Sequence, residues 1–309
     1  MVGAAQYNVV TAAQCRESGV TEGQVKTLCR DRRWLRLNDG VYLLDADVVS
    51  GDPPRQALIR AALFSAGPRA VAVLGTAAEV LNIAGLPAGG TIHVSLPGPQ
   101  ARPRRSADPQ VQTHQLVLRA GETTVVDSIP VTTPARTVAD LIVRSSRMTA
   151  VSVLDSSLNR RILLEDELDL VRGLITGKRG ATRARPWIAE ADARAESPLE
   201  TRVRLRAIDG GIPPDEVQFR VRARTGGIIA IADFAWWRFG VRVVGEADGV
   251  DAHDNPVALF RDRTRQNDIV AAGYWPVRFA WPDTLDAATV PRLIRGAISG
   301  AQAALTRPA

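Results

Sequence analysis

The last third of the chain most constrains the fold, because it reads as a helix followed by three alternating segments. The helix starts in AESPLETRVRLRAIDGG, where Ser197 is a good N-cap, Pro198 suits the first turn and Glu200 would complete a capping box. The segments VQFRVRA, IIAIADFAWW and VRVVGEADG follow, separated by turn residues at 225–227 and 238–240. This pattern predicts a helix and a three-stranded antiparallel meander.

The second hairpin of this meander is expected to bring acidic residues together. The midpoint between Asp233 and Glu246 falls inside the turn at 238–240, so a hairpin centred there places the two carboxylates opposite one another. Asp248 lies two residues beyond Glu246 and therefore on the same face of the strand. Like charges that face one another across a sheet are destabilising, and a bound divalent cation would remove the repulsion. The alternative is that Asp233 ends a strand and Asp248 belongs to an ordinary Asp-Gly turn.

Three convergent carboxylates predict a metal site with a defined chemistry. The oxygen ligands of Asp233, Glu246 and Asp248 suit Mg²⁺ or Mn²⁺. An ion of this type can clamp a scissile phosphate and lower the pKa of an attacking water. The expected reaction is therefore phosphodiester hydrolysis.

A family resemblance supports this interpretation of the last third of the chain. The pieces SPLE, VQFRV, IADFAWW, GEADG, His253 and RQNDIVAAGYWPVRF resemble, in this order, the core of the PD-(D/E)XK nuclease superfamily, and above all the domains similar to very-short-patch-repair endonucleases. The resemblance implies an active site formed by Glu200, Asp233, Glu246 and Asp248, with His253 and Gln218 at polar positions nearby.

The chain departs from that pattern at one position. The lysine that often stands two residues after the glutamate is Asp248 here, so the group that orients the nucleophile or stabilises developing charge is unassigned. Several arginines nearby could supply the charge: Arg220, Arg222, Arg261, Arg263 and Arg265.

The N-terminal segment predicts a winged helix-turn-helix. VVTAAQCRESG and TEGQVKTLCRDRRW read as two short helices, and LRLNDGVYLL reads as a hairpin with Asp39-Gly40 at its turn. In such a module the second helix enters a DNA major groove and the wing meets the backbone. The expected phosphate contacts come from Arg30, Arg32, Arg33 and Arg36. Alternatively, these arginines are the solvated face of a small helical module.

The middle of the chain reads as scaffolding. Residues 53–85 predict a long helical stretch, and TIHVSLPG and VQTHQLVL predict strands around the basic loop ARPRRSADP. His93 and His114 lie in these strands, where a hydrogen-bonded structural histidine is the expected role. Two further amphipathic helices are expected in 148–175, and the basic segment TGKRGATRARPW is either a domain boundary near residue 180 or a connecting basic loop.

A second resemblance covers the N-terminal half. The pieces RDRRWLRLNDGVYLL, TIHVSLPG and IPVTTPARTVADL are similar to antitoxins of the AbiEi type, which belong to type IV toxin-antitoxin systems. The resemblance implies a winged helix that binds its own promoter and a downstream domain that opposes a nucleotidyltransferase toxin without stable contact.

Composition narrows the class of partner. Of the 39 basic residues only Lys26 and Lys178 are lysine, and the net charge of +6 favours a polyanion such as DNA. Cys15 and Cys29 support neither a disulfide framework nor a zinc knuckle. No signal peptide, long apolar run, P-loop lysine motif or nucleophile elbow is found, so we expect a cytoplasmic protein without membrane contact.

These observations combine into one prediction. We expect an α+β or α/β chain with a winged helix-turn-helix in 1–48, an AbiEi-like mixed α/β middle domain in 49–180 and a restriction-endonuclease-like domain in 190–300. The expected function is DNA binding with Mg²⁺-dependent or Mn²⁺-dependent DNA cleavage. The alternative is a transcriptional autorepressor or antitoxin whose nuclease-like domain is inactive.

Overall fold

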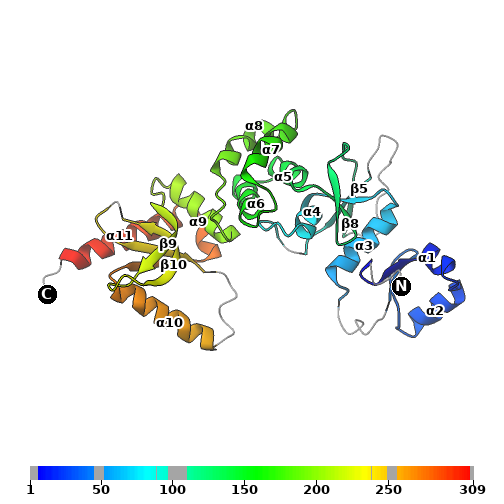
Figure 1. Cartoon of the computed structure of the whole chain (residues 1–309), viewed down its shortest axis with the longest axis horizontal. Coiled ribbons are helices and arrows are strands. Elements are labelled where there is room, and N and C mark those ends of the chain that lie inside the picture. Colours follow the sequence, from blue (N-terminus) through cyan, green and yellow to red (C-terminus); the bar gives the residue numbers. More distant parts are fainter. Residues whose placement is uncertain are drawn as a thin grey trace. The chain divides into compact units, whose positions relative to one another are not determined.

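Three sheets and the helices around them make up the described part of the chain, which is a mixed α+β protein as expected. The computed structural model describes residues 6–44, 52–87, 89–96, 110–237, 239–248 and 256–306, with only the backbone of 256–262. The chain divides into two compact units, Met1–Arg144 with Ile162–Ala181 and Ser145–Arg161 with Thr182–Ala309 (Figure 1). No helix within the described ranges has both the length and the apolar character needed to cross a bilayer.

The first helices of the chain both begin with a capping box. Each starts at a threonine that is followed three residues later by a glutamine, so Thr11 Oγ1 accepts from the Gln14 N–H and Thr21 Oγ1 from the Gln24 N–H. The predicted helix pair and hairpin are confirmed, and a short strand before them joins the sheet in the order β1-β3-β2. The elements are β1 (Val9–Thr11), α1 (Ala12–Glu17), α2 (Glu22–Arg30), β2 (Leu35–Asn38) and β3 (Val41–Leu43).

The second sheet of the first unit interrupts the helical stretch predicted for 53–85. Gly67 ends a helix with a φ of 120°, and the strand that follows pairs Ala72 with both Val94 and Val131. The apolar run there is a buried strand because its backbone is hydrogen-bonded on both sides, so the prediction of one long helical stretch was wrong. The strands lie in the order β6-β5-β4-β8-β7: β4 (Val71–Ala72), β5 (Ile92–Ser95), β6 (Val111–His114), β7 (Thr123–Val126) and β8 (Ile129–Thr132). The helices are α3 (Arg55–Ala66), α4 (Leu74–Val80), α5 (Pro134–Ile142) and α7 (Leu168–Ile175).

Buried polar contacts fasten the elements of this unit. Arg136 in the VTTPARTVADL segment forms ion pairs with Glu122 and, at 2.8 Å, with Asp140. Lys178 also contacts Asp140, at 2.6 Å, and so ties the TGKRG segment to α5. Both motifs therefore have a structural role. His93 Nδ1 lies 2.9 Å from Nε2 of His114, which confirms the expected hydrogen-bonded histidines.

The second unit contains the predicted meander and a fourth strand. The β9–β10 and β10–β11 pairs are antiparallel as expected, whereas β12 pairs in parallel with β11, giving the order β12-β11-β10-β9. Helices α9 and α11 pack on one apolar cluster of the sheet, and α10 packs on another (Figure 1). The bounds are α9 (Pro198–Asp209), β9 (Glu216–Arg222), β10 (Ile228–Trp236), β11 (Val243–Ala247), α10 (Pro256–Ala271), β12 (Trp275–Phe279) and α11 (Thr289–Thr306).

Helix α6 (Arg147–Asn159) belongs to this second unit, although the sequence assigned it to the middle domain. The reason is burial: Asp155 on α6 pairs at 2.7 Å with Arg204 on α9, and both side chains are almost completely covered. A break near residue 180 agrees with the end of the first unit at Ala181. The division of the first unit into a winged-helix domain and a middle domain stays a prediction.

Candidate functional site

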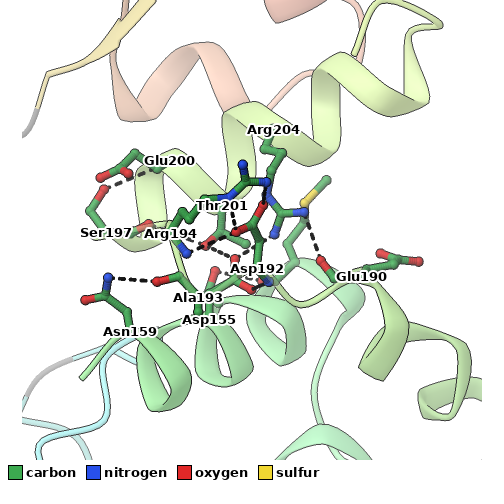
Figure 2. Close-up of polar contacts among 12 residues, drawn as sticks. Asp155, Asn159, Glu190, Asp192, Ala193, Arg194, Ser197, Glu200, Thr201 and Arg204 are labelled. Carbon is green, nitrogen blue, oxygen red and sulfur yellow. Dashed lines mark hydrogen bonds and ion pairs between the residues drawn. The ribbon is translucent and has the colours of Figure 1, made fainter. Parts of the chain in front are cut away.

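The first turn of α9 holds one acidic side chain in a buried position. Ser197 caps the helix as predicted, with its hydroxyl accepting from the Glu200 N–H at 3.2 Å. The Glu200 carboxylate accepts from the Glu196 N–H at 2.9 Å. A capping box would require the Ser197 N–H as the donor, so the predicted capping box was wrong. The same carboxylate also accepts from Gln218 Nε2 at 3.1 Å, and burial raises its pKa. Figure 2 shows Glu200 beside Ser197 at this end of the helix.

In the register of β10 and β11, two further carboxylates face one another. Phe234 pairs with Gly245, so the next position places Asp233 opposite Glu246, as predicted from a turn centred between them. The Ala247 N–H donates to Asp233 Oδ2 at 2.7 Å, so the side chain itself is fastened to β11. Glycine precedes Glu246 because a Cβ there would lie 2.9 Å from ring atoms of both Phe279 and Trp236.

The same register extends across the whole sheet. The pairs around Asp233 place Gln218 of β9 opposite it, and the parallel pairing of β11 with β12 places Arg278 beside Glu246. Each of the four strands therefore contributes one polar residue to a single row. Gln218 has a φ of 53°, an unusual value for a non-glycine residue within a strand.

Two guanidinium groups lie against the acidic residues of this row. Arg265 of α10 forms an ion pair with Glu246 and donates to the Ile231 carbonyl at 3.2 Å. Arg278 lies 3.6 Å from Glu246 Oε2 and 3.4 Å from Asp248 Oδ2. Arg265 was among the expected cations. Arg278 was not, although it stands in the WPVRF piece of the resemblance, because its place depends on parallel pairing between distant segments.

Burial and like charge together disturb the titration of the site. Burial is the main reason that the pKa of Asp233 rises to about 7, and repulsion by Glu200 and Glu246 adds to the rise. The Ala247 N–H and Arg265 act in the opposite direction. Asp233 and Glu200 also line one small pocket together with Arg204. Glu200, Asp233 and Glu246 therefore form one electrostatically coupled group.

Asp248 has a different environment from the other predicted ligands. Its side chain is 44% exposed and is paired with Arg278 at the end of β11. Among the described side chains, no three histidine, cysteine or acidic residues lie close enough to share a metal ion. Mg²⁺ is usually held by one or two carboxylates with water and substrate phosphate, so Asp233 and Glu246 alone fit that ion if Arg265 leaves Glu246. His253 lies outside the described residues.

Comparison with known proteins defines the family. No protein-family model matches the chain. Two proteins of Mycobacterium tuberculosis, "Uncharacterized protein MT2308" of strain CDC 1551 / Oshkosh and "Uncharacterized protein Rv2248" of strain ATCC 25618 / H37Rv, are each 31% identical to it over 208 residues, covering 67% of this chain and 73% of their own. The chain belongs to the family of these two mycobacterial proteins.

A solved structure is more distantly similar. The crystal structure of RV2827C protein from Mycobacterium tuberculosis has a TM-score of 0.38 and 14% sequence identity, and the match covers 62% of this chain and 79% of that one. The names of the RV2827C protein and of the two mycobacterial relatives state no activity.

The arginines expected to contact DNA lie together in the first unit. Arg30, Arg32, Arg33 and Arg36 are all exposed, and they follow one another from the end of α2 into β2. Arg30 contacts Asp31 at 3.0 Å, and Arg36 forms an ion pair with Asp39 at the hairpin turn. Exposed pairs of this kind are weak, so they hold the side chains only loosely.

A buried polar network supports the helix that carries Glu200 (Figure 2). Asp155 of α6 accepts from Arg204 Nη2 at 2.7 Å, from the Thr201 hydroxyl at 2.8 Å and from the Asp192 N–H at 2.7 Å. Burial nevertheless raises the pKa of Asp155, although these donors favour its charged form. Since Thr201 and Arg204 follow Glu200 within the next turn of α9, the network fixes the end of the helix that presents this carboxylate.

Proposed function

We propose that this protein binds DNA and cleaves it by Mg²⁺-dependent hydrolysis of a phosphodiester. The observation that carries the proposal is the pair formed by half-buried Asp233 and buried Glu246, which face one another across β10 and β11 next to Glu200. Buried carboxylates that repel one another are a costly arrangement unless a cation binds between them. In this proposal the second unit is a restriction-endonuclease-like domain related to very-short-patch-repair endonucleases.

Each side chain of the site has a separate task in this reaction. Asp233 and Glu246 would hold the cation through their carboxylate oxygens, and Glu200, anchored by the Glu196 N–H and Gln218, would orient water beside them. Bound Mg²⁺ would polarise the phosphate and lower the pKa of the attacking water. The water oxygen forms a bond to phosphorus, the ester P–O bond breaks, and the leaving oxygen takes up a proton. One phosphomonoester end and one hydroxyl end result.

DNA binding is assigned to the N-terminal helix pair and hairpin. Support comes from two capped helices, a hairpin directly after the second, and exposed arginines at Arg30, Arg32, Arg33 and Arg36. In a winged helix-turn-helix these groups meet phosphates on either side of the major groove. The resemblance of the first half of the chain to AbiEi-type antitoxins is part of the same proposal.

A second candidate function is a transcriptional autorepressor or antitoxin whose nuclease-like domain is inactive. The observation in its favour is that Arg265 and Arg278 already neutralise Glu246 and Asp248 without a cation. Such a protein would bind its own promoter and oppose a nucleotidyltransferase toxin without stable contact.

Cleavage of supercoiled plasmid by the full chain separates the two candidates. The protein is incubated with plasmid in Mg²⁺, in Mn²⁺ or in EDTA, and nicked circles are counted over time. We expect nicking in either metal and none in EDTA. Glu246→Gln should reduce the rate by at least about 100-fold, because losing a ligand of the cation costs several kcal/mol. Glu216→Gln, the same change at an exposed position of β9, is the matched control.

Either result identifies the function. Metal-dependent nicking that is lost in Glu246→Gln and kept in Glu216→Gln supports the endonuclease. No nicking in any metal, with a retarded band on promoter DNA that is unaffected by EDTA, supports the repressor. Nicking that persists in EDTA would contradict the metal site.

A further inference from the structure

Carboxylates repel a phosphodiester, since both groups are negatively charged. Glu200, Asp233, Glu246 and Asp248 lie in or beside the row across the sheet. A phosphate that enters this region would be stabilised by a positively charged side chain of the protein, in addition to any metal ion. Two side chains supply such a charge, Arg265 from α10 and Arg278 from β12.

Arg278 is fixed to the sheet. It is the parallel register partner of Glu246, and the next residue, Phe279, is fully buried and accepts from the Asp248 N–H at 2.9 Å. The guanidinium lies at 3.6 Å from Glu246 and 3.4 Å from Asp248, so it is shared between two carboxylates at distances longer than a close ion pair. The side chain is 34% exposed. It can therefore meet a ligand at the surface while both acids keep its orientation.

Arg265 differs in each of these respects. It comes from a helix, forms the closer ion pair with Glu246, and also bonds the Ile231 carbonyl. The carboxylate that it occupies is one that the proposed cation needs. Arg265 therefore acts as the counter-ion of Glu246 when no cation is bound.

We propose that Arg278 is a catalytic residue whose guanidinium contacts the scissile phosphate. Its planar fork can donate two parallel N–H bonds to non-bridging oxygens and stabilise the charge that develops as the P–O bond breaks. Asp248 then orients Arg278 and is not a metal ligand. The inference rests on the proposed endonuclease function and adds a residue to it.

Single-turnover nicking with the full chain tests this role. At saturating protein, Arg278→Ala should slow the chemical step by about 100-fold to 1,000-fold, the cost of removing one preorganised donor. The dissociation constant of the Arg278→Ala variant for the same plasmid, measured in EDTA, should differ from that of the unmodified protein by less than about threefold. DNA affinity depends mainly on many other phosphate contacts. Added guanidinium ion should restore part of the lost rate, which no purely structural defect would allow. Arg292→Ala, an exposed arginine of α11 in the same unit, is the matched control and should keep its rate within about threefold.

A second variant covers the case in which Arg278→Ala does not fold. Arg278→Lys keeps the charge and loses the fork, so the rate should fall about tenfold or more. A normal rate in Arg278→Ala or Arg278→Lys, while the unmodified protein nicks and Glu246→Gln does not, would overturn the role of Arg278 and leave the endonuclease standing. Absence of nicking by the unmodified protein would overturn both.

Discussion

Asp233 combines burial with repulsion from two neighbouring carboxylates, and this makes its charge dependent on pH near neutrality. Its pKa is about 7 in the folded protein against an ordinary value of 3.8. Between these two values the unfolded chain has released this proton while the folded chain retains it. The folded state therefore loses stability from this group as pH rises from about 4 to about 7, and loses no more above that range.

We predict that Asp233→Asn removes this loss. The variant should gain stability relative to the unmodified protein, and the gain should be larger at about pH 8 than at about pH 5, since Asp233 is charged only at the higher pH. Thermal unfolding without divalent metal measures the difference in midpoint at both pH values. Asp268→Asn, at an exposed aspartate on α10 of the same unit, serves as control and should show no such trend. A difference for Asp233→Asn that is the same at both pH values would show that its carboxyl is not perturbed.

At the scale of elements, α6 and α9 are joined by charge as well as by apolar packing. Asp155 and Arg204 are both almost completely buried, and the Thr201 hydroxyl and the Asp192 N–H also donate hydrogen bonds to the Asp155 carboxylate. A buried ion pair of this kind contributes little more to stability than apolar residues would, but losing one partner leaves the other charge buried without a counter-ion. The helix that presents Glu200 therefore depends on a residue about 45 positions earlier in the chain.

We predict that Asp155→Ala destabilises the second unit by about 3–5 kcal/mol, because the Arg204 guanidinium would stay buried without its counter-ion. Urea unfolding followed by tryptophan fluorescence measures the change, since this unit contains Trp187, Trp236, Trp237, Trp275 and Trp281. The double variant Asp155→Ala with Arg204→Met should recover part of the loss. Glu216→Ala, a substitution of an exposed acidic residue in the same unit, should cost less than about 1 kcal/mol. Equal effects of the two single substitutions would exclude a special role for the buried pair.

At the scale of the whole molecule, the expected DNA contacts and the acidic site belong to different compact units. Arg32 and Arg33 lie in the first unit, whereas Asp233 and Glu246 lie in the second. Binding and cleavage should therefore respond to different substitutions. This separation also allows one activity to be lost in evolution while the other is kept, as the repressor alternative requires.

We predict that Arg32→Ala with Arg33→Ala weakens DNA binding and lowers its salt dependence. Each lost phosphate contact should reduce the slope of log K against log salt by about 0.9, so the double variant should lose about 1.8. Electrophoretic mobility shifts over a series of salt concentrations measure the slope. The nicking rate at saturating protein should stay within about twofold, because the chemical step takes place in the other unit. Arg292→Ala, an exposed arginine of α11, is the control, and an equal loss there would point to unspecific charge.

The sequence by itself determined the parts of this protein that depend on near neighbours in the chain. The cap at Ser197 and the register that places Asp233 opposite Glu246 follow from residues close together in the chain, since caps and hairpin turns are local structures. These local signals were enough to predict the meander and the central carboxylate pair.

Only the tertiary structure decided the features that join distant segments. The parallel pairing of β11 with β12 brings Arg278 to Glu246 from 32 positions away, and no turn between them sets that register. The strand at Val71–Ala72 and the placement of α6 with α9 likewise depend on which surfaces become buried together. Local patterns cannot specify such pairings, because the free energy of burial depends on the whole set of elements that assemble around a core.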